Sequence, residues 1–508
     1  MKRKINARHF FGKKNIKSPK VIALAVFLVL ILAAGGIFLK NMITKDDNLI
    51  NISDLSNEFV EEYFRKVAEN NANEDYKKEN LLIAISKDPI RNTYGAVDVT
   101  EAPNHQYFLQ YDSEEAKTKA FRELQKDENI HIEENHKVEL YNDVSEPSYN
   151  SWGIEKMGFD YISEKYDDGN LGSVSVAILD TGCDMEVFNR HFNGKIVNSY
   201  SVIDNKTGAE NMYDNVGHGT HIAGTIAEAT PSNVTIVPVK ASDSMELFDA
   251  DIINGINWIV INNAADVINM SFGSGDYNEA NYVAIEAARQ NNIISVVASG
   301  NEYADESSYP AKFDNTISVG AVDSNLEKAV FSNSDSDLTF SAPGVDILSL
   351  NAGSTSSETD LISMNGTSMA TPHVVSAVAT LQGFKSDLSL EQIIDVLKEF
   401  AIDLGPKGHD DYFGYGMIDF SSFVRCDGAE NCDNLNIYKT ENRIEVSPIV
   451  TEYNYGSLTN ILATEVKLYL DEENYPANKL PRNCRVCTPR PLSRSYTGTC
   501  SAGARENG

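Results

Sequence analysis

The sequence predicts an α/β fold: a doubly wound, mainly parallel sheet with helices on both faces, preceded by a small α+β module. Two observations support this expectation. Short apolar runs rich in β-formers, such as residues 173–179 (SVSVAIL), are typical of buried parallel strands. Helical segments alternate with these runs over most of the chain, as in parallel sheets. The length of 508 residues allows two or three domains.

The first 40 residues predict a membrane-directed segment. Residues 1–20 contain eight Lys or Arg and no acidic residue, and residues 21–39 are apolar. This apolar run is just long enough to span a bilayer, and the basic residues before it place the N-terminus in the cytoplasm. A signal-anchor and a signal peptide cut near residues 33–36 are both compatible with the pattern, which favours the anchor. Either way, the rest of the chain is expected to be exported.

A small module is expected before the main body. Residues 41–80 are polar and acidic, with helical character at 59–67. Strands are then expected at 81–86 and 106–111, a helix at 113–125, and a partly alternating strand at 130–140. In that last strand the expected inward positions are Ile130, Ile132, Val138 and Leu140.

The main body repeats the strand and helix pattern. Its expected strands are 173–179, 234–239, 267–270, 293–298, 316–322, 338–341 and 346–349, and its expected helices are 249–262, 279–290, 366–384 and 390–400.

Three polar side chains lie at the ends of these elements. Asp180 follows an apolar strand directly, where sites of α/β proteins usually lie. His218 lies between two glycines at the start of a small-residue helix, and Ser368 opens another helix. Each segment alone is also compatible with an ordinary turn or helix cap. Together they suit nucleophilic catalysis, because a serine needs an imidazole base and that base needs a carboxylate to orient it.

Two further observations agree with nucleophilic catalysis: a possible donor for the oxyanion, and a sequence without a recognisable set of metal ligands. Asn301 follows strand 293–298 and can donate a side-chain N–H to a developing negative charge. His218 and His221 lack the spacing and the further ligands of a metal pair. Cys484 and Cys487 lack a second cysteine pair, so we name no metal ligand and no cofactor.

These segments resemble the subtilisin-like serine proteases (subtilases, peptidase S8). The matching motifs are AILDTG, GHGTHIAGT, VINMSFG, ASGN and GTSMATPH, in the family's order of Asp, His and Ser. The resemblance covers roughly residues 151–424 and implies a subtilisin-like fold and serine endopeptidase activity on proteins or peptides. It implies that Asp180 orients His218, that His218 is the general base and acid, and that Ser368 is the nucleophile. Asn301 and the backbone N–H of Ser368 would form the oxyanion hole.

The resemblance also implies a pocket and a propeptide. The expected walls of the pocket for the side chain before the cut bond are Ser271, Phe272, Gly273, Ser299 and Gly300. The upstream module, about residues 80–141, resembles the family's propeptide, which assists folding and then inhibits. A self-processing zymogen is therefore expected, with its own propeptide as partner and the cut within residues 141–149.

Two departures from the family pattern have consequences. The connection at 229–233 is too short for the calcium-binding loop of many subtilisins, so that site is expected to be absent, while structural calcium elsewhere stays open without named ligands. Glu302, Asp305 and Glu306 follow the oxyanion asparagine and suggest that the enzyme tolerates or prefers basic side chains in its substrate. Cys183 lies near Asp180, and we interpret it as a small buried core residue.

The expected organisation follows from these assignments. Residues 1–20 form a cytoplasmic basic segment, 21–39 the membrane segment, 41–147 the propeptide region, 148–424 the catalytic domain and 425–508 a C-terminal extension. The extension is β-prone at first, whereas 482–508 hold five Arg and three Cys and read as disordered or truncated.

Composition and motif order limit the alternatives. The net charge of −31 argues against nucleic-acid binding. A catalytically silent surface-binding protein on the same fold is the alternative function, and the complete set of catalytic positions favours the enzyme. A carboxylesterase would share the acyl chemistry but lacks the G-x-S-x-G elbow and its chain order.

Overall fold

A computed structural model of the chain describes residues 55–73, 76–141, 143–145, 152–166 and 171–425, and four short strands at 437–439, 444–445, 466–468 and 496–498. The predicted membrane segment at 21–39 and most of the C-terminal extension lie outside the described residues. Within the described part, every helix is too short or too polar to cross a membrane.

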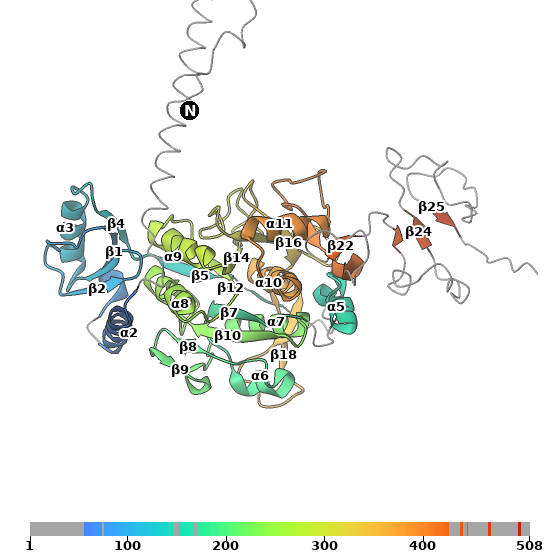
Figure 1. Ribbon diagram of the computed structural model, residues 1–508, viewed down its shortest axis with the longest axis horizontal. Coiled ribbons are helices and arrows are strands. Elements are labelled where there is room, and N and C mark those ends of the chain that lie inside the picture. Colours follow the sequence, from blue (N-terminus) through green and yellow to red (C-terminus); the bar gives the residue numbers. More distant parts are fainter. Residues whose placement is uncertain are drawn as a thin grey trace, which may run out of the picture.

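The centre of the molecule is an eight-stranded sheet (Figure 1). Its order is β16 (Phe340–Pro343), β15 (Ile317–Val322), β14 (Ile294–Ala298), β12 (Val267–Met270), β7 (Val174–Asp180), β10 (Val234–Lys240), β8 (Tyr200–Ser201) and β9 (Lys206–Thr207). All neighbouring strands are parallel except β8 and β9. After β10 the chain crosses to the other side of β7 and continues with β12. The carboxyl end of β7 therefore lies at a topological switch point, where α/β proteins bind their ligands.

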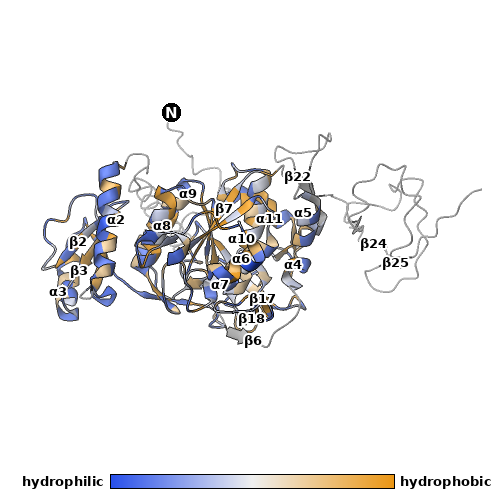
Figure 2. Ribbon diagram, turned by 90° about the horizontal axis from the view of Figure 1, so that it is seen from below, coloured by the Kyte–Doolittle hydropathy of each residue, from blue (hydrophilic) through white to orange (hydrophobic). Residues whose placement is uncertain are grey.

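Helices cover both faces of this sheet. The helices α7 (His218–Ala229) and α10 (Thr367–Phe384) pack on one face, and α8 (Asp249–Ile261) and α9 (Glu279–Gln290) pack on the other. Side chains alternate along β7 accordingly: Ile178 joins the core around α7 and α10, whereas Leu179 joins the core around α8 and α9. Figure 2 shows the hydrophobic residues gathered on the central strands. The predicted doubly wound α/β fold is confirmed.

The N-terminal module is a four-stranded antiparallel sheet lying beside α8 and α9 (Figure 1). Its order is β2 (Asp98–Ala102), β3 (Gln106–Gln110), β1 (Leu81–Ile85) and β4 (His131–Glu134), with α3 (Glu114–Leu124) packed on it. The helix α2 (Asn57–Ala72) precedes the sheet and contacts the main body, where Tyr63 is buried against α8.

The segment predicted as one strand at 130–140 is divided between two sheets. Residues 131–134 form β4 of the module, whereas β5 (Lys137–Leu140) lies between β11 (Glu246–Phe248) and β13 (Phe272–Gly273) of the main body. Ile132, Val138 and Leu140 are buried as predicted, and Ile130 is partly buried. The alternation along the sequence was real, but it could not show that the chain changes sheet between β4 and β5.

The remaining elements are shorter helices and small sheets outside the central sheet. The helices are α4 (Trp152–Lys156), α5 (Phe159–Tyr166), α6 (Met185–Phe192) and α11 (Leu390–Glu399). A three-stranded antiparallel sheet contains β17 (Ile347–Leu350), β18 (Leu361–Asn365) and β6 (Asp143–Ser145). Two further pairs join β19 (Ala401–Ile402) with β20 (Met417–Ile418) and β21 (Phe423–Arg425) with β22 (Ile437–Lys439), and the last small sheet holds β23 (Ile444–Glu445), β24 (Val466–Leu468) and β25 (Tyr496–Gly498).

Candidate active site

Asp180 and His218 form a buried pair at the switch point. The His218 Nδ1 atom lies 2.8 Å from one carboxylate oxygen of Asp180 and 3.0 Å from the other. Both side chains are fully buried. Asp180 also accepts a hydrogen bond from the backbone N–H of Thr181, which fixes the plane of the carboxylate. The carboxylate thus holds the imidazole with Nδ1 directed toward it and Nε2 directed away.

Asp214 places His218 by organising the start of α7. One oxygen of Asp214 accepts the backbone N–H groups of Val216 and Gly217, and the other accepts the N–H and the hydroxyl of Thr220. Free N–H groups at a helix start need such an acceptor, and a carboxylate there also suits the helix dipole. The sequence interpretation missed this role, although Asp214 lies just before the Gly-His-Gly motif, at a capping distance from Thr220.

Ser368 opens α10 and is fully buried. Its hydroxyl donates to the carbonyl oxygen of Ser271 at 2.8 Å. His218 Nε2 has no hydrogen-bond partner among the described residues. The serine hydroxyl and the imidazole are therefore not hydrogen-bonded to each other in this structure.

Residues 137–140 and 143–145 form two extended strands, one on each side of Ser368. On one side of Ser368, β5 pairs antiparallel with both β11 and β13. The backbone N–H of Tyr141 then donates to the Ser368 hydroxyl oxygen at 3.2 Å. On the other side, β6 pairs antiparallel with β18, with Asp143 opposite Asn365. The chain thus lies across the serine with strand partners on both sides, as a polypeptide substrate would.

Asn301 and Gly366 border the carbonyl group of Tyr141. The Asn301 side-chain oxygen accepts both the N–H and the hydroxyl of Thr367, at 3.0 and 2.9 Å. A Cβ atom placed on Gly366 would lie 2.1 Å from the Tyr141 carbonyl oxygen and 3.2 Å from Asn301 Nδ2. Only a glycine lets this carbonyl approach so closely, and Asn301 Nδ2 lies near the same glycine.

The Tyr141 side chain fills the expected pocket. It is 5 % exposed, and its hydroxyl donates to the Ser308 hydroxyl oxygen at 3.1 Å. A Cβ atom on Gly273 would lie 2.9 Å from the Tyr141 hydroxyl, so Gly273 leaves the room that the ring occupies. Ser299 contributes through its carbonyl oxygen, which accepts the backbone N–H of Ser308 at 2.8 Å.

The remaining predicted wall residues lie around the same pocket. Phe272 pairs with Leu140 in the register of β13 with β5, and a Cβ atom on Gly300 would lie 2.7 Å from the Ser308 hydroxyl oxygen. The side chain in the pocket is aromatic, so the structure gives no support to a preference for basic residues. Two of the acidic residues on which that hypothesis rested have partners within the chain. Glu306 forms an ion pair with Lys312, and Glu302 accepts a hydrogen bond from Asn333.

Other notable residues near the site have structural roles. His221 directs Nε2 at the carbonyl oxygens of Ile347 and Ile362, 3.0 and 3.2 Å away, and burial lowers its pKa to about 3. Burial likewise lowers the pKa of His373 to about 4. Cys183 is fully buried, and burial raises the pKa of its thiol well above the ordinary value. It is the small core residue that the sequence indicated.

A short connection joins α7 to β10, at the place where the sequence predicts no calcium loop. The helix ends at Ala229 and β10 begins at Val234. The ammonium of Lys195 lies against the end of α7, within 2.7–3.1 Å of four oxygens of Ala227, Thr230 and Pro231. The described residues contain no cluster of His, Cys, Asp or Glu suited to a metal ion.

Comparisons with known proteins agree with this geometry. Residues 172–416 match the Subtilase family. Subtilisin J of Geobacillus stearothermophilus is 36 % identical over 317 residues, covering 59 % of this chain and 77 % of that protein. Subtilisin E of Bacillus subtilis is 35 % identical over the same length and coverage.

A solved structure shows the same fold. Fervidolysin from Fervidobacterium pennivorans, described as a keratinolytic enzyme related to subtilisin, matches with a TM-score of 0.57. The match covers 67 % of this chain and 60 % of that chain, at 22 % identity. From the relatives and the family match, the chain belongs to the subtilase family and is a serine endopeptidase.

Proposed function

We propose that Ser368, His218 and Asp180 are the nucleophile, the general base and acid, and the orienting carboxylate of this endopeptidase. The pairing of His218 with Asp180, and the chain lying across Ser368, support these roles. For attack, the Ser368 hydroxyl turns from the Ser271 carbonyl toward His218 Nε2, which takes its proton. The serine oxygen then bonds to the substrate carbonyl carbon, and the carbon–nitrogen bond breaks as His218 gives its proton to the leaving amine. Water then hydrolyses the acyl-enzyme, which frees Ser368.

Charge developing on the substrate oxygen is stabilised by Asn301 and the start of α10. Asn301 Nδ2 faces the Tyr141 carbonyl region because Thr367 holds the other end of its amide. The Ser368 backbone N–H lies at the first turn of α10, where the helix dipole favours negative charge. Such preorganised donors act in a site from which water is excluded.

The first substrate of the enzyme is its own chain, cut between Tyr141 and Asn142. The observation that carries this proposal is the strand pairing of residues 137–140 before Ser368 and 143–145 after it. Tyr141 occupies the pocket for the side chain before the cut bond, which favours large aromatic residues at that position in other substrates. Before release, the same segment excludes other substrates, so the chain is made as a zymogen.

Export and membrane attachment are proposed from the sequence alone. Residues 21–39 direct the chain across the membrane, with the catalytic domain outside the cell. A cut after Tyr141 separates the catalytic domain from the membrane segment. The contacts of α2 with the main body, including Tyr63 with Asn257 and Asn71 with the Val202 carbonyl, would retain the N-terminal fragment until it is displaced or degraded.

Processing of the purified chain from residue 41 onward tests this function. A fluorophosphonate probe and N-terminal sequencing of every band are applied to the wild type, to Ser368→Ala and to Ser376→Ala. We expect the wild type to be labelled and to show a new N-terminus at Asn142. Ser376 is a buried serine later in the same helix, so Ser376→Ala is the matched control and is expected to keep labelling and processing.

The outcomes separate the parts of the proposal. Ser368→Ala should be folded, unlabelled and uncut. A new N-terminus elsewhere would overturn the assignment of the Tyr141–Asn142 bond but leave the catalytic residues in place. Processing or labelling that persists in Ser368→Ala would overturn Ser368 as the nucleophile.

A further inference from the structure

We propose that Arg190 and His191 of α6, together with Asp360, are positioning residues for the part of the substrate that follows the cut bond. The inference rests on the proposed catalytic site and adds a determinant that lies outside it. Its parts are a buried carboxylate, two basic side chains that hold it, and a strand that begins at this carboxylate and ends beside the nucleophile.

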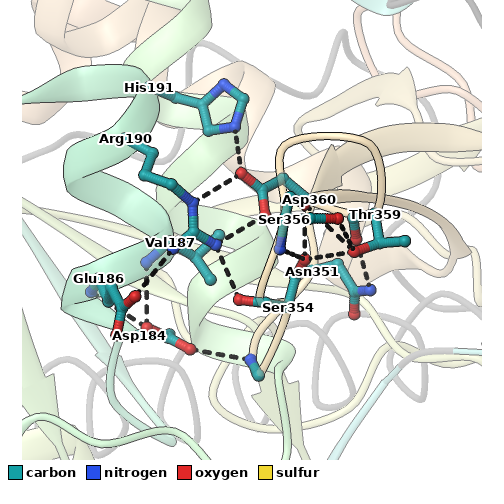
Figure 3. Close-up of polar contacts among 11 residues, drawn as sticks. Asp184, Glu186, Val187, Arg190, His191, Asn351, Ser354, Ser356, Thr359 and Asp360 are labelled. Atoms are coloured by element: carbon teal, nitrogen blue, oxygen red, sulfur yellow. Dashed lines mark hydrogen bonds and ion pairs between the residues drawn. The ribbon is translucent and has the colours of Figure 1, made fainter.

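The contact joins two segments that are distant in the sequence (Figure 3). Arg190 donates from Nε and Nη2 to the two oxygens of Asp360, at 2.9 and 2.7 Å. His191 Nε2 lies 2.9 Å from the same carboxylate, which is fully buried. These bonds, led by those from Arg190, hold the pKa of Asp360 below its ordinary value, so it stays ionised. A two-point Arg–carboxylate contact fixes orientation as well as distance.

The loop that carries Asp360 is closed on itself. The backbone N–H of Asn351 donates to the Asp360 carbonyl at 2.7 Å, across the base of the β17–β18 connection. Arg190 also donates to the Ser354 carbonyl at 2.7 Å, and the Gly353 N–H donates to Asp184 at 2.8 Å. The connection between β17 and β18 is therefore tied to the start and to the end of α6.

The strand that follows Asp360 is a substrate-binding element. β18 pairs antiparallel with residues 143–145, which are the second to fourth positions after the proposed cut. The same strand runs through Asn365 and Gly366 into Ser368. A shift at Asp360 would thus move the groups that hold the leaving side of the substrate. Small displacements of bound segments are costly when the reacting atoms must be aligned.

The start of α6 connects β18 to the segment that carries His218. Asp184 caps α6 by accepting the N–H groups of Glu186 and Val187, and its own N–H donates to the Thr220 hydroxyl. Thr220 is in α7, next to His218, and is held by Asp214. The Asp360 contact therefore holds β18 in a fixed position relative to the histidine side of the cleft.

Two substrates measured on processed enzyme separate positioning from general stability. The short substrate is a peptide p-nitroanilide with Tyr as its last residue, so no amino acid follows the cut bond. The other is a fluorescence-quenched peptide that continues through the sequence of residues 142–145. For Arg190→Met and Asp360→Asn we expect kcat/KM for the long peptide to fall about tenfold relative to the short one. Arg190→Lys and His191→Gln should give smaller losses with the same split.

A second measurement gives a result that a misfolded fraction of a variant would not change. The acyl-enzyme formed from a Tyr ester reacts either with water or with an added peptide amide that has the sequence of residues 142–145. The ratio of aminolysis to hydrolysis does not depend on how many enzyme molecules are active. We expect this ratio to fall in the Arg190 and Asp360 variants. Lys398→Met, which removes an exposed ion pair with Asp395, is the control and should leave it unchanged.

The outcomes distinguish this inference from the proposed function. An unchanged ratio with equal losses on both substrates would overturn the positioning role alone. Wild-type protein that cleaves neither substrate would overturn the proposed catalytic residues as well.

Discussion

The backbone N–H of Tyr141 donates a hydrogen bond to the hydroxyl oxygen of Ser368 over 3.2 Å. The two residues are far apart in the chain, and the contact places the nucleophile next to the bond it is proposed to cut. Strand pairing on both sides of Tyr141 explains why the contact forms: β5 and β6 each have partners in the main body. Backbone pairing of this kind is how extended peptides add to an exposed sheet edge.

Replacing Asn301 should slow the chemical step while substrate binding is preserved. Its amide is oriented by Thr367 toward the Tyr141 carbonyl region. In subtilisins the loss of one such donor costs about 2.7–4 kcal/mol of transition-state stabilisation. For Asn301→Leu we expect kcat to fall with little change in KM on a Tyr p-nitroanilide. A rise in KM at unchanged kcat would contradict the role.

Ser308 should set the preference for tyrosine over phenylalanine before the cut bond. It accepts the hydrogen bond of the Tyr141 hydroxyl at 3.1 Å in a buried pocket. A net neutral hydrogen bond contributes about 1 kcal/mol, or roughly a fivefold preference. Ser308→Ala should remove this preference in kcat/KM for paired Tyr and Phe substrates. The Phe substrate is the internal control, and a parallel loss on both substrates would argue against the hydrogen bond.

Acid should destabilise the fold through its buried histidines. Burial lowers the folded-state pKa of His221 to about 3 and of His373 to about 4, from an ordinary value of 6.5. Their contribution to stability is complete above pH 6.5, because both states are then neutral. As pH falls from 6.5 toward those lower values, only the unfolded chain takes up these protons. Each histidine then removes up to about 1.4 kcal/mol of stability per pH unit.

A histidine variant isolates this effect. Unfolding by urea between pH 7 and about pH 4.5, a window that spans the ordinary His pKa, is measured on Ser368→Ala, which cannot digest itself. Adding His221→Gln should lower stability at pH 7, where it removes the contacts to Ile347 and Ile362, but should make the fall in acid shallower. An unchanged slope would show that His221 takes up its proton in the folded state.

Lys195 should stabilise the end of α7. Its ammonium donates to the carbonyl oxygens of Ala227, Thr230 and Pro231, where the helix dipole also favours a cation. Hydrogen bonds to a charged group contribute about 1.5–3 kcal/mol. Lys195→Met should therefore lower the urea midpoint, again in the Ser368→Ala background. Lys206→Met in exposed β9 is the control, and equal midpoints for the two variants would contradict the proposal.

The sequence by itself determined the fold class and the positions of the catalytic candidates. Alternation of apolar strands with helices is enough to predict a parallel sheet, because buried strands need helical cover on both faces. Asp180, His218 and Asn301 are recognisable from sequence because each lies in a short motif at a strand end or a helix start. Glycines and small residues in these motifs leave the polar side chain accessible. The structure brings Asp180 and His218 into contact and places Asn301 beside Ser368 at the same edge.

Tertiary structure alone decided which segments meet at that edge. Ser308 and Asp360 carry no local signal, because their roles come from strand pairing and packing between distant parts of the chain. For Tyr141 the sequence predicts only that it is one end of the region 141–149 that contains the cut. Residues 130–140 alternate in part, which predicts one strand, yet β4 and β5 belong to different sheets. Local sequence sets the conformation and the inward face of a strand, whereas its partner is set by long-range hydrogen bonds and shared burial. Those long-range contacts placed the chain across Ser368.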